Sequence, residues 1–234
     1  LLSMRETLWR IGKNRKLSMD GRLLMALSLG HDAMRRLRAG RPEEILTLLS
    51  RYEADTAPEQ FLRLLNRREQ AESRFAFMAD FMEVLSGLSP ISPKWPDMLE
   101  RCRKTLYHEP GCRARYDGER EKFLLENPEL TLHWERLFGY FIYSFFLSSL
   151  YDGDVYGNVR LAVYCTFAVM ELDFAEWRTS GRPAGGWDGK QAEICHVFAR
   201  QVENSDENRK VLAEALTAGR FGIGEAAAGV PVRF

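Results

Sequence analysis

The sequence has few cysteines, and they are widely spaced. Its 234 residues include only Cys102, Cys112, Cys165 and Cys195, and no pair has the C-x-x-C spacing of a zinc ribbon or an iron–sulfur site. Cys165 and Cys195 have apolar neighbours, which indicates reduced thiols in a core and therefore a reducing cytoplasm. The sequence predicts no metal site within this chain and a cytoplasmic location.

Long hydrophobic runs and a net charge are also missing. The longest uncharged run, residues 137–151, is too short and too rich in Ser and Tyr to span a bilayer, and no signal peptide opens the chain. The 33 Lys and Arg residues balance 33 Asp and Glu residues, so no overall field attracts nucleic acid or anionic lipid. We therefore expect neither a nucleic-acid partner nor a membrane partner.

Signals for strands and for nucleotide-binding turns are weak. No period-two alternation is convincing, and the glycine cluster of Gly219, Gly222 and Gly224 follows no predicted strand. A Rossmann-like methyltransferase fold is disfavoured because the alternation of strand and helix is missing. The four histidines show no i, i+4 pair of the kind that binds a metal on a helix.

Apolar residues at helical spacing run through most of the chain. This pattern predicts an all-α, multi-helix bundle that could form two packed subdomains. Ser18 is placed to cap one helix, and a long helix is expected from Thr56 to Leu85. Breaks in the pattern divide the chain into an N-terminal bundle, a linker with short helices, an aromatic-rich bundle and a flexible tail: 1–88, 89–128, 129–218 and 219–234.

The stretch SSLYDGDVYGNVRLAVY joins two predicted helices through an acidic corner and has two interpretations. In the first, Asp154 caps the following helix and Gly153 supplies the turn. In the second, Tyr151, Asp152, Asp154 and Tyr156 line a cleft where carboxylates hold an amine or another cation. Both interpretations stay open on the sequence alone.

Residues 202–212 pose a similar choice. Ser205 or Asp206 is placed to cap a helix, whereas Glu203 and Asn208 could face a shared polar pocket.

These stretches together carry a family resemblance. Glu126-Asn127-Pro128 precedes an aromatic helix, Asp152-Gly153-Asp154 precedes a Val- and Ala-rich helix, and Glu203, Ser205 and Asn208 lie near the end. In this order of elements, and in the early segment 17–53, the sequence resembles the C-terminal region of the flagellin lysine-N-methylase family.

The resemblance implies a protein-lysine N-methyltransferase that methylates surface lysines of flagellin with S-adenosylmethionine. Family members carry an N-terminal cysteine-rich segment that looks like an iron–sulfur site, and none of the four cysteines here matches it. Because the first residue is Leu1 rather than Met, we expect the helical C-terminal part of such an enzyme, inactive alone. Asn204 stands where family members often have His.

The family resemblance makes several residues candidates for the site, most of them in the two acidic stretches. Deprotonation of the lysine ammonium would fall to the catalytic candidates, and the others would bind substrate. The catalytic candidates are Tyr151, Asp152, Asp154 and Tyr156, and the substrate-binding candidates are Glu203, Asn208, Trp134 and Arg160. The alternative is a non-catalytic helical module that binds flagellin or another protein, which exposed aromatic or Arg residues along a groove would favour.

Overall fold

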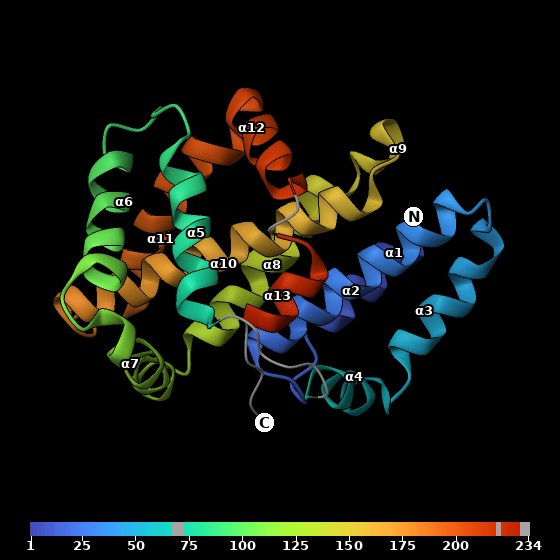
Figure 1. Ribbon diagram of the computed structural model, residues 1–234, viewed down its shortest axis with the longest axis horizontal. Helices are drawn as coiled ribbons and strands as arrows, with labels where there is room; N and C mark the ends of the chain where they lie inside the picture. Colours follow the sequence, from blue (N-terminus) through green and yellow to red (C-terminus); the bar gives the residue numbers. More distant parts are fainter. Residues whose placement is uncertain (67–72, 219–220, 230–234) are drawn as a thin grey trace. The chain divides into compact units, whose positions relative to one another are not determined.

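The computed structural model describes residues 1–66, 73–218 and 221–229, and every regular element among them is helical (Figure 1). The predicted all-α class is confirmed. No helix in these described ranges is both long and apolar enough to cross a membrane. The main helices in chain order are α1 (Leu2–Gly12), α2 (Met19–Arg38), α3 (Ile45–Glu53), α4 (Ala57–Asn66), α5 (Arg74–Ser86), α6 (Trp95–Arg103), α7 (Cys112–Glu126), α8 (Leu130–Phe146), α9 (Ser149–Asp152), α10 (Val155–Ser180), α11 (Trp187–Phe198), α12 (Asp206–Thr217) and α13 (Ile223–Gly229). Short turns of other helix types are η1 (Pro42–Glu44), η2 (Lys104–His108) and η3 (Ala199–Glu203).

Local signals place several helix ends correctly. The Ser18 hydroxyl accepts a hydrogen bond from the Gly21 N–H at 3.3 Å and caps α2, as predicted. The single helix expected from Thr56 to Leu85 is instead two helices, α4 and α5, and residues 67–72 between them lie outside the described residues.

Two compact units make up the chain, and each is assembled from separate segments. The first unit contains 1–73, 133–166 and 219–234, and the second contains 74–132 and 167–218. The regions predicted from the sequence are contiguous because they were divided at turns that Pro and Gly mark. A compact unit instead depends on which distant helices pack together. The unit boundaries pass through α8 and α10.

In the first unit, α2 packs against α1, α3, α4 and α13 (Figure 1). Its Gly30 lies so close to α10 that an added Cβ would come within 3.1 Å of the Val159 Cβ. Arg22 of α2 is only 3% exposed, and its guanidinium donates to the Leu17 and Gly12 carbonyls at 3.0 and 3.1 Å. It also pairs with Glu135 of α8 at 3.2 Å, so one side chain joins α1, α2 and α8.

Part of the segment that the sequence predicts as a flexible tail is a helix, α13, in the first unit. Helix α13 packs on α2, and its Ala226 is fully buried. The Tyr164 hydroxyl donates to the Phe221 carbonyl at 3.2 Å and holds the chain just before this helix. Ala227 is buried as well, so this short helix contributes small apolar side chains to the interior, which composition alone does not show. Residues 219–220 and 230–234 of the predicted tail lie outside the described residues.

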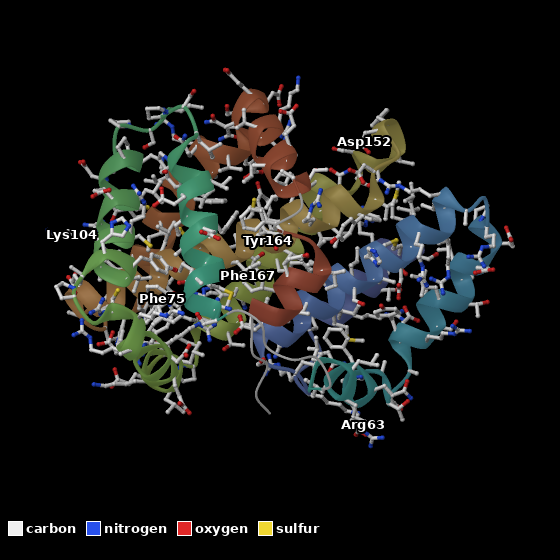
Figure 2. The ribbon with its side chains drawn as sticks, in the orientation of Figure 1. Arg63, Phe75, Lys104, Asp152, Tyr164 and Phe167 are labelled. Carbon is white, nitrogen blue, oxygen red and sulfur yellow. The ribbon has the colours of Figure 1, made fainter. Side chains whose placement is uncertain are left out.

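The second unit is organised around a buried carboxylate on α10. Glu171 receives hydrogen bonds from the Arg74 guanidinium at 2.9 Å and from the Tyr107 and Tyr116 hydroxyls at 2.8 Å each. Phe75, labelled in Figure 2, packs its ring against both tyrosine rings at 5.3 and 5.6 Å. Burial, followed by the Glu171 charge, raises the pKa of both tyrosines, so their hydroxyls remain donors to the carboxylate. The pairing offsets the large cost of burying a charge.

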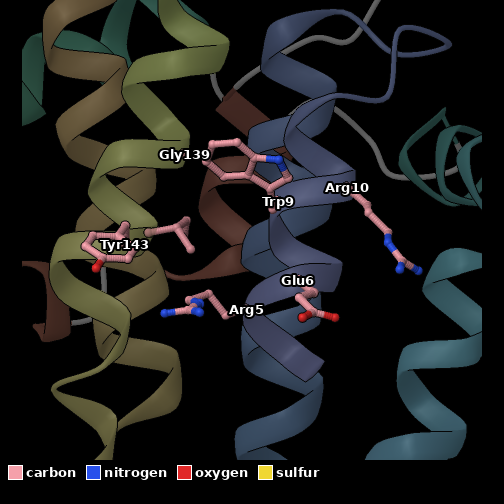
Figure 3. Close-up of a pocket in the computed structure, with 7 residues that line it drawn as sticks. Arg5, Glu6, Trp9, Arg10, Gly139 and Tyr143 are labelled. Carbon is pink, nitrogen blue, oxygen red and sulfur yellow. The ribbon is translucent and has the colours of Figure 1, made fainter. Parts of the chain in front are cut away.

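Helices α1 and α8 approach closely in the first unit. The Trp9 indole lies across Gly139 of α8 (Figure 3), where an added Cβ would come within 2.2 Å of the ring. Gly12 of α1 similarly contacts Phe138. Only glycine at position 139 leaves room for the indole in this position.

We expect Gly139→Ala to lower the free energy of unfolding by about 1–3 kcal/mol, the usual cost of overpacking. The comparison is Gly118→Ala on α7, where an added Cβ meets nothing within 4 Å, so helix propensity alone should make it neutral or stabilising by up to about 1 kcal/mol. Urea unfolding measures both. In a Trp9→Ala background the cost of Gly139→Ala should disappear; an undiminished cost would contradict the proposed contact.

Candidate functional site

The acidic corner between α9 and α10 is a hydrogen-bonded turn. The Asp152 carboxylate, labelled in Figure 2, accepts from the Asp154 N–H at 2.8 Å. The Asn158 side-chain amide donates to both Asp152 oxygens at 3.0 and 3.2 Å and to the Ser149 hydroxyl at 3.2 Å. The Asp152 side chain therefore has a fixed position although it is exposed to solvent.

Asp154 caps α10. Its Oδ1 accepts from the Gly157 N–H at 2.9 Å, which confirms the capping interpretation. An added Cβ at Gly157 would come within 2.1 Å of Asp154 Oδ2, so the glycine makes room for the carboxylate. Gly153 has φ +68°, a conformation that glycine adopts without strain. The catalytic roles suggested for Asp152 and Asp154 stay predictions.

The two tyrosines of the corner are in different environments. Tyr151, at 93% exposure, points into solvent beside Leu150, which is 62% exposed. Tyr156 is half-buried; its ring meets the His31 ring edge-on at 5.5 Å, and the Arg160 guanidinium lies 5.0 Å from its centre. Two predicted site residues, Tyr156 and Arg160, are therefore brought together with a histidine that was not predicted.

The protonation of Tyr156 follows from its surroundings. Burial is the largest influence and raises the pKa of its hydroxyl, although the Arg160 charge and the Ile223 backbone act in the opposite direction. Tyr156 is accordingly a neutral phenol near pH 7. It can orient a polar group by hydrogen bonding, but it does not supply a phenolate base.

The remaining substrate-binding candidates lie in structural positions. The Asn208 side chain exchanges hydrogen bonds with the Ser89 backbone at 3.0 and 2.8 Å and donates to the Gln201 carbonyl at 2.8 Å, fastening the chain after α5 to α12. Its own N–H donates to Ser205 Oγ at 3.2 Å, so Ser205 is the cap of α12. Glu203 ends η3, and its carbonyl accepts from Arg209 at 3.2 Å.

Trp134 belongs to the interior of the first unit, where it is 1% exposed. For Trp134, as for Glu203 and Asn208, a part in substrate binding stays a prediction.

A groove between α1 and α8 was not predicted from the sequence. It has a volume of about 300 Å³ (Figure 3) and is lined by Arg5, Glu6, Trp9, Arg10, Gly139, Ile142 and Tyr143. The Arg5 guanidinium lies 5.5 Å from the centre of the Tyr143 ring, and the Lys13 ammonium lies 4.5 Å from the centre of the Trp9 ring. The signal in the sequence was Trp9 among the basic residues Arg5, Arg10 and Lys13, but the pairing of α1 with α8 required the structure.

The cysteines do not fit an iron–sulfur cluster. Cys102, Cys112 and Cys165 are buried and Cys195 is partly buried, all as free thiols. Burial raises the pKa of Cys195 to about 12, so this thiol is protonated at neutral pH and is a poor metal ligand. Within the described part of the chain, no group of three or more His, Cys, Asp or Glu residues is placed to hold a metal ion.

Comparison with known proteins identifies a relationship at the level of a family. The family model described as FliB lysine N-methylase C-terminal domain matches residues 5–227. Searches of curated proteins and of solved structures found no match. The matched range includes segments of both compact units.

The cap at Asp154 can be tested by substitution. Asp154→Ala should lower the free energy of unfolding by about 1 kcal/mol, because the Gly157 N–H loses its acceptor. Asp154→Asn keeps a side-chain oxygen and should retain most of the stability. Thermal or urea unfolding measures the difference, and equal stabilities of the two variants would contradict the capping role.

Proposed function

The chain belongs to the FliB lysine N-methylase C-terminal domain family, and on this premise we propose that it is the C-terminal part of an enzyme that methylates surface lysines of flagellin. The observation that carries the proposal is the family match from residue 5 to residue 227. The proposed methyl donor is S-adenosylmethionine, and the reduced thiols are consistent with a reaction in the cytoplasm.

The chemistry demands a group that takes a proton from the lysine. An ε-ammonium has no lone pair, so it must be deprotonated before nitrogen attacks the donor methyl group, which S-adenosylmethionine supplies when bound. Asp152 is exposed and held in one orientation, which suits a carboxylate that receives an ammonium group and accepts its proton. Tyr156 stays protonated and would position a substrate group rather than act as the base.

The iron–sulfur cluster is proposed for the complete enzyme, in a cysteine-rich segment outside this chain. The four thiols here do not fit as its ligands, and none of the steps assigned to this chain uses it. We also assign the donor to no residue of this chain. Each of the two rings of the α1/α8 groove already has a cation of the protein over it, which disfavours a second cation, the donor's sulfonium, beside it.

We test the catalytic proposal in the complete protein with Asp152→Asn. If the carboxylate accepts the proton, kcat for flagellin methylation should fall by about 10²–10⁴-fold, the range for removing a general base, while the melting temperature changes little. Asp55→Asn, an exposed carboxylate of the same unit, is the matched control and should leave kcat unchanged. Unchanged methylation by a fully folded Asp152→Asn variant would remove the corner from the mechanism.

A second candidate function is a non-catalytic module that holds flagellin while the reaction takes place elsewhere. The exposed Trp9 and Tyr143 and the arginines along the α1/α8 groove favour this candidate. Separate titrations of the protein with S-adenosylmethionine and with flagellin discriminate between the two. Binding of flagellin by this chain without the donor supports the module, and a loss of kcat in the Asp152→Asn variant of the complete enzyme, with flagellin binding retained, supports the catalytic role.

A further inference from the structure

The α1/α8 groove continues onto an exposed surface that is both aromatic and basic. Helices α1 and α8 run antiparallel here, since Trp9 meets Gly139 while Arg5 meets Tyr143. Two large side chains that line the groove are exposed, Trp9 at 43% and Tyr143 at 64%. Leu2 of α1 and Tyr140 of α8, at 61% and 47%, are exposed on the same two helices. Such a cluster of exposed rings on one face is typical of a binding surface.

Several cations on α1 and α8 are not paired with a carboxylate of the described residues and can therefore bind an anion. Among the residues that the structure describes, no carboxylate lies within ion-pair distance of Arg5, Lys13 or Arg136, the last of which lies on α8 one turn before Gly139. Arg10 differs, because it pairs with Glu53 at 3.1 Å. Glu6 is the one carboxylate among the residues lining the groove.

These charges decide which part of a protein substrate the groove can accept. A target lysine would approach the positive charges of Arg5 and Lys13, which already lie over the Tyr143 and Trp9 rings, so its ammonium is disfavoured there. Carboxylates are favoured beside the same cations, and an apolar side chain fits between Trp9 and Tyr143. Nucleic acid is less suited, because its long run of phosphates is attracted by a large excess of positive charge and this chain has no net charge.

We propose that the α1/α8 groove binds an acidic segment of the protein substrate, in which Asp or Glu residues flank one apolar side chain. This assignment rests on the proposed function, since it gives the methylase a docking surface separate from the lysine that reacts. The positive charges of Arg5 and Lys13 raise the rate at which the segment associates and make its binding sensitive to salt. Once the segment is bound, the apolar area that it covers on the Trp9 and Tyr143 rings slows its dissociation.

The direct test measures binding of two labelled peptides to the complete protein by fluorescence anisotropy. One peptide carries Asp and Glu on both sides of a single Leu, and the other replaces each acidic residue by Lys. The acidic peptide should bind at least about tenfold more tightly, with an affinity that falls as salt is added. Equal affinity for the two peptides, or a higher affinity for the lysine peptide, would overturn the proposal, and this comparison needs no variant.

Variants then locate the binding surface. The double change Arg5→Glu with Lys13→Glu should weaken binding of the acidic peptide by about tenfold or more, and Trp9→Ala should weaken it as well. Arg51→Glu on α3 is the matched control: it reverses an exposed charge in the same unit and should leave binding unchanged. Equal effects of Arg51→Glu and the double variant would overturn the assignment, as would a single-stranded oligonucleotide that displaces the peptide more effectively than unlabelled acidic peptide.

Methylation kinetics separate failure of this inference from failure of the proposed function. The double variant should raise KM for flagellin about tenfold and leave kcat unchanged, because the groove binds substrate without touching the reacting atoms. Normal methylation with an unchanged KM would overturn the docking surface and leave the methylase function standing. Selective peptide binding by a complete protein that methylates no flagellin would support the groove and refute the function.

Discussion

The first compact unit depends on how closely α1 approaches α8 at Gly139. The absence of a side chain there admits the Trp9 indole, and the antiparallel alignment that follows brings Arg5 to the Tyr143 ring. Buried Arg22 holds the arrangement by bonding the end of α1 and pairing with Glu135 on α8. A shift of α8 would leave the buried Arg22 without its Glu135 partner, which favours the present alignment of the two helices.

The polar residues of the chain divide between stabilising the fold and remaining available for binding. Glu171 and Asn208 use their side chains to hold the second unit together. Asp154 is similarly committed to the start of α10, whereas Asp152 keeps an exposed, oriented carboxylate. We propose that the groove docks the substrate and that the corner accepts the proton. Both roles use exposed side chains that can reach a substrate.

Features set by neighbours in sequence could be predicted, and features set by distant neighbours could not. The caps at Ser18, Asp154 and Ser205 involve residues three positions apart, so spacing was sufficient. The partners of Glu171 lie at least 55 residues away, and its position in an apolar helix gave no indication of them. The groove escaped prediction for the same reason, since its two walls are separated by more than a hundred residues.

Site-specific photo-crosslinking tests most directly whether this domain docks a protein substrate through the α1/α8 surface. A photoreactive side chain at Tyr140, an exposed residue of α8 that follows Gly139 of the groove in sequence, is compared with one at Leu125 on α7, which is 76% exposed. In the complete protein mixed with flagellin, the account predicts crosslinks from position 140 to an acidic stretch of flagellin, and their loss when acidic peptide is added. Crosslinks that form equally from both positions, or that map to a lysine-rich stretch, would contradict it.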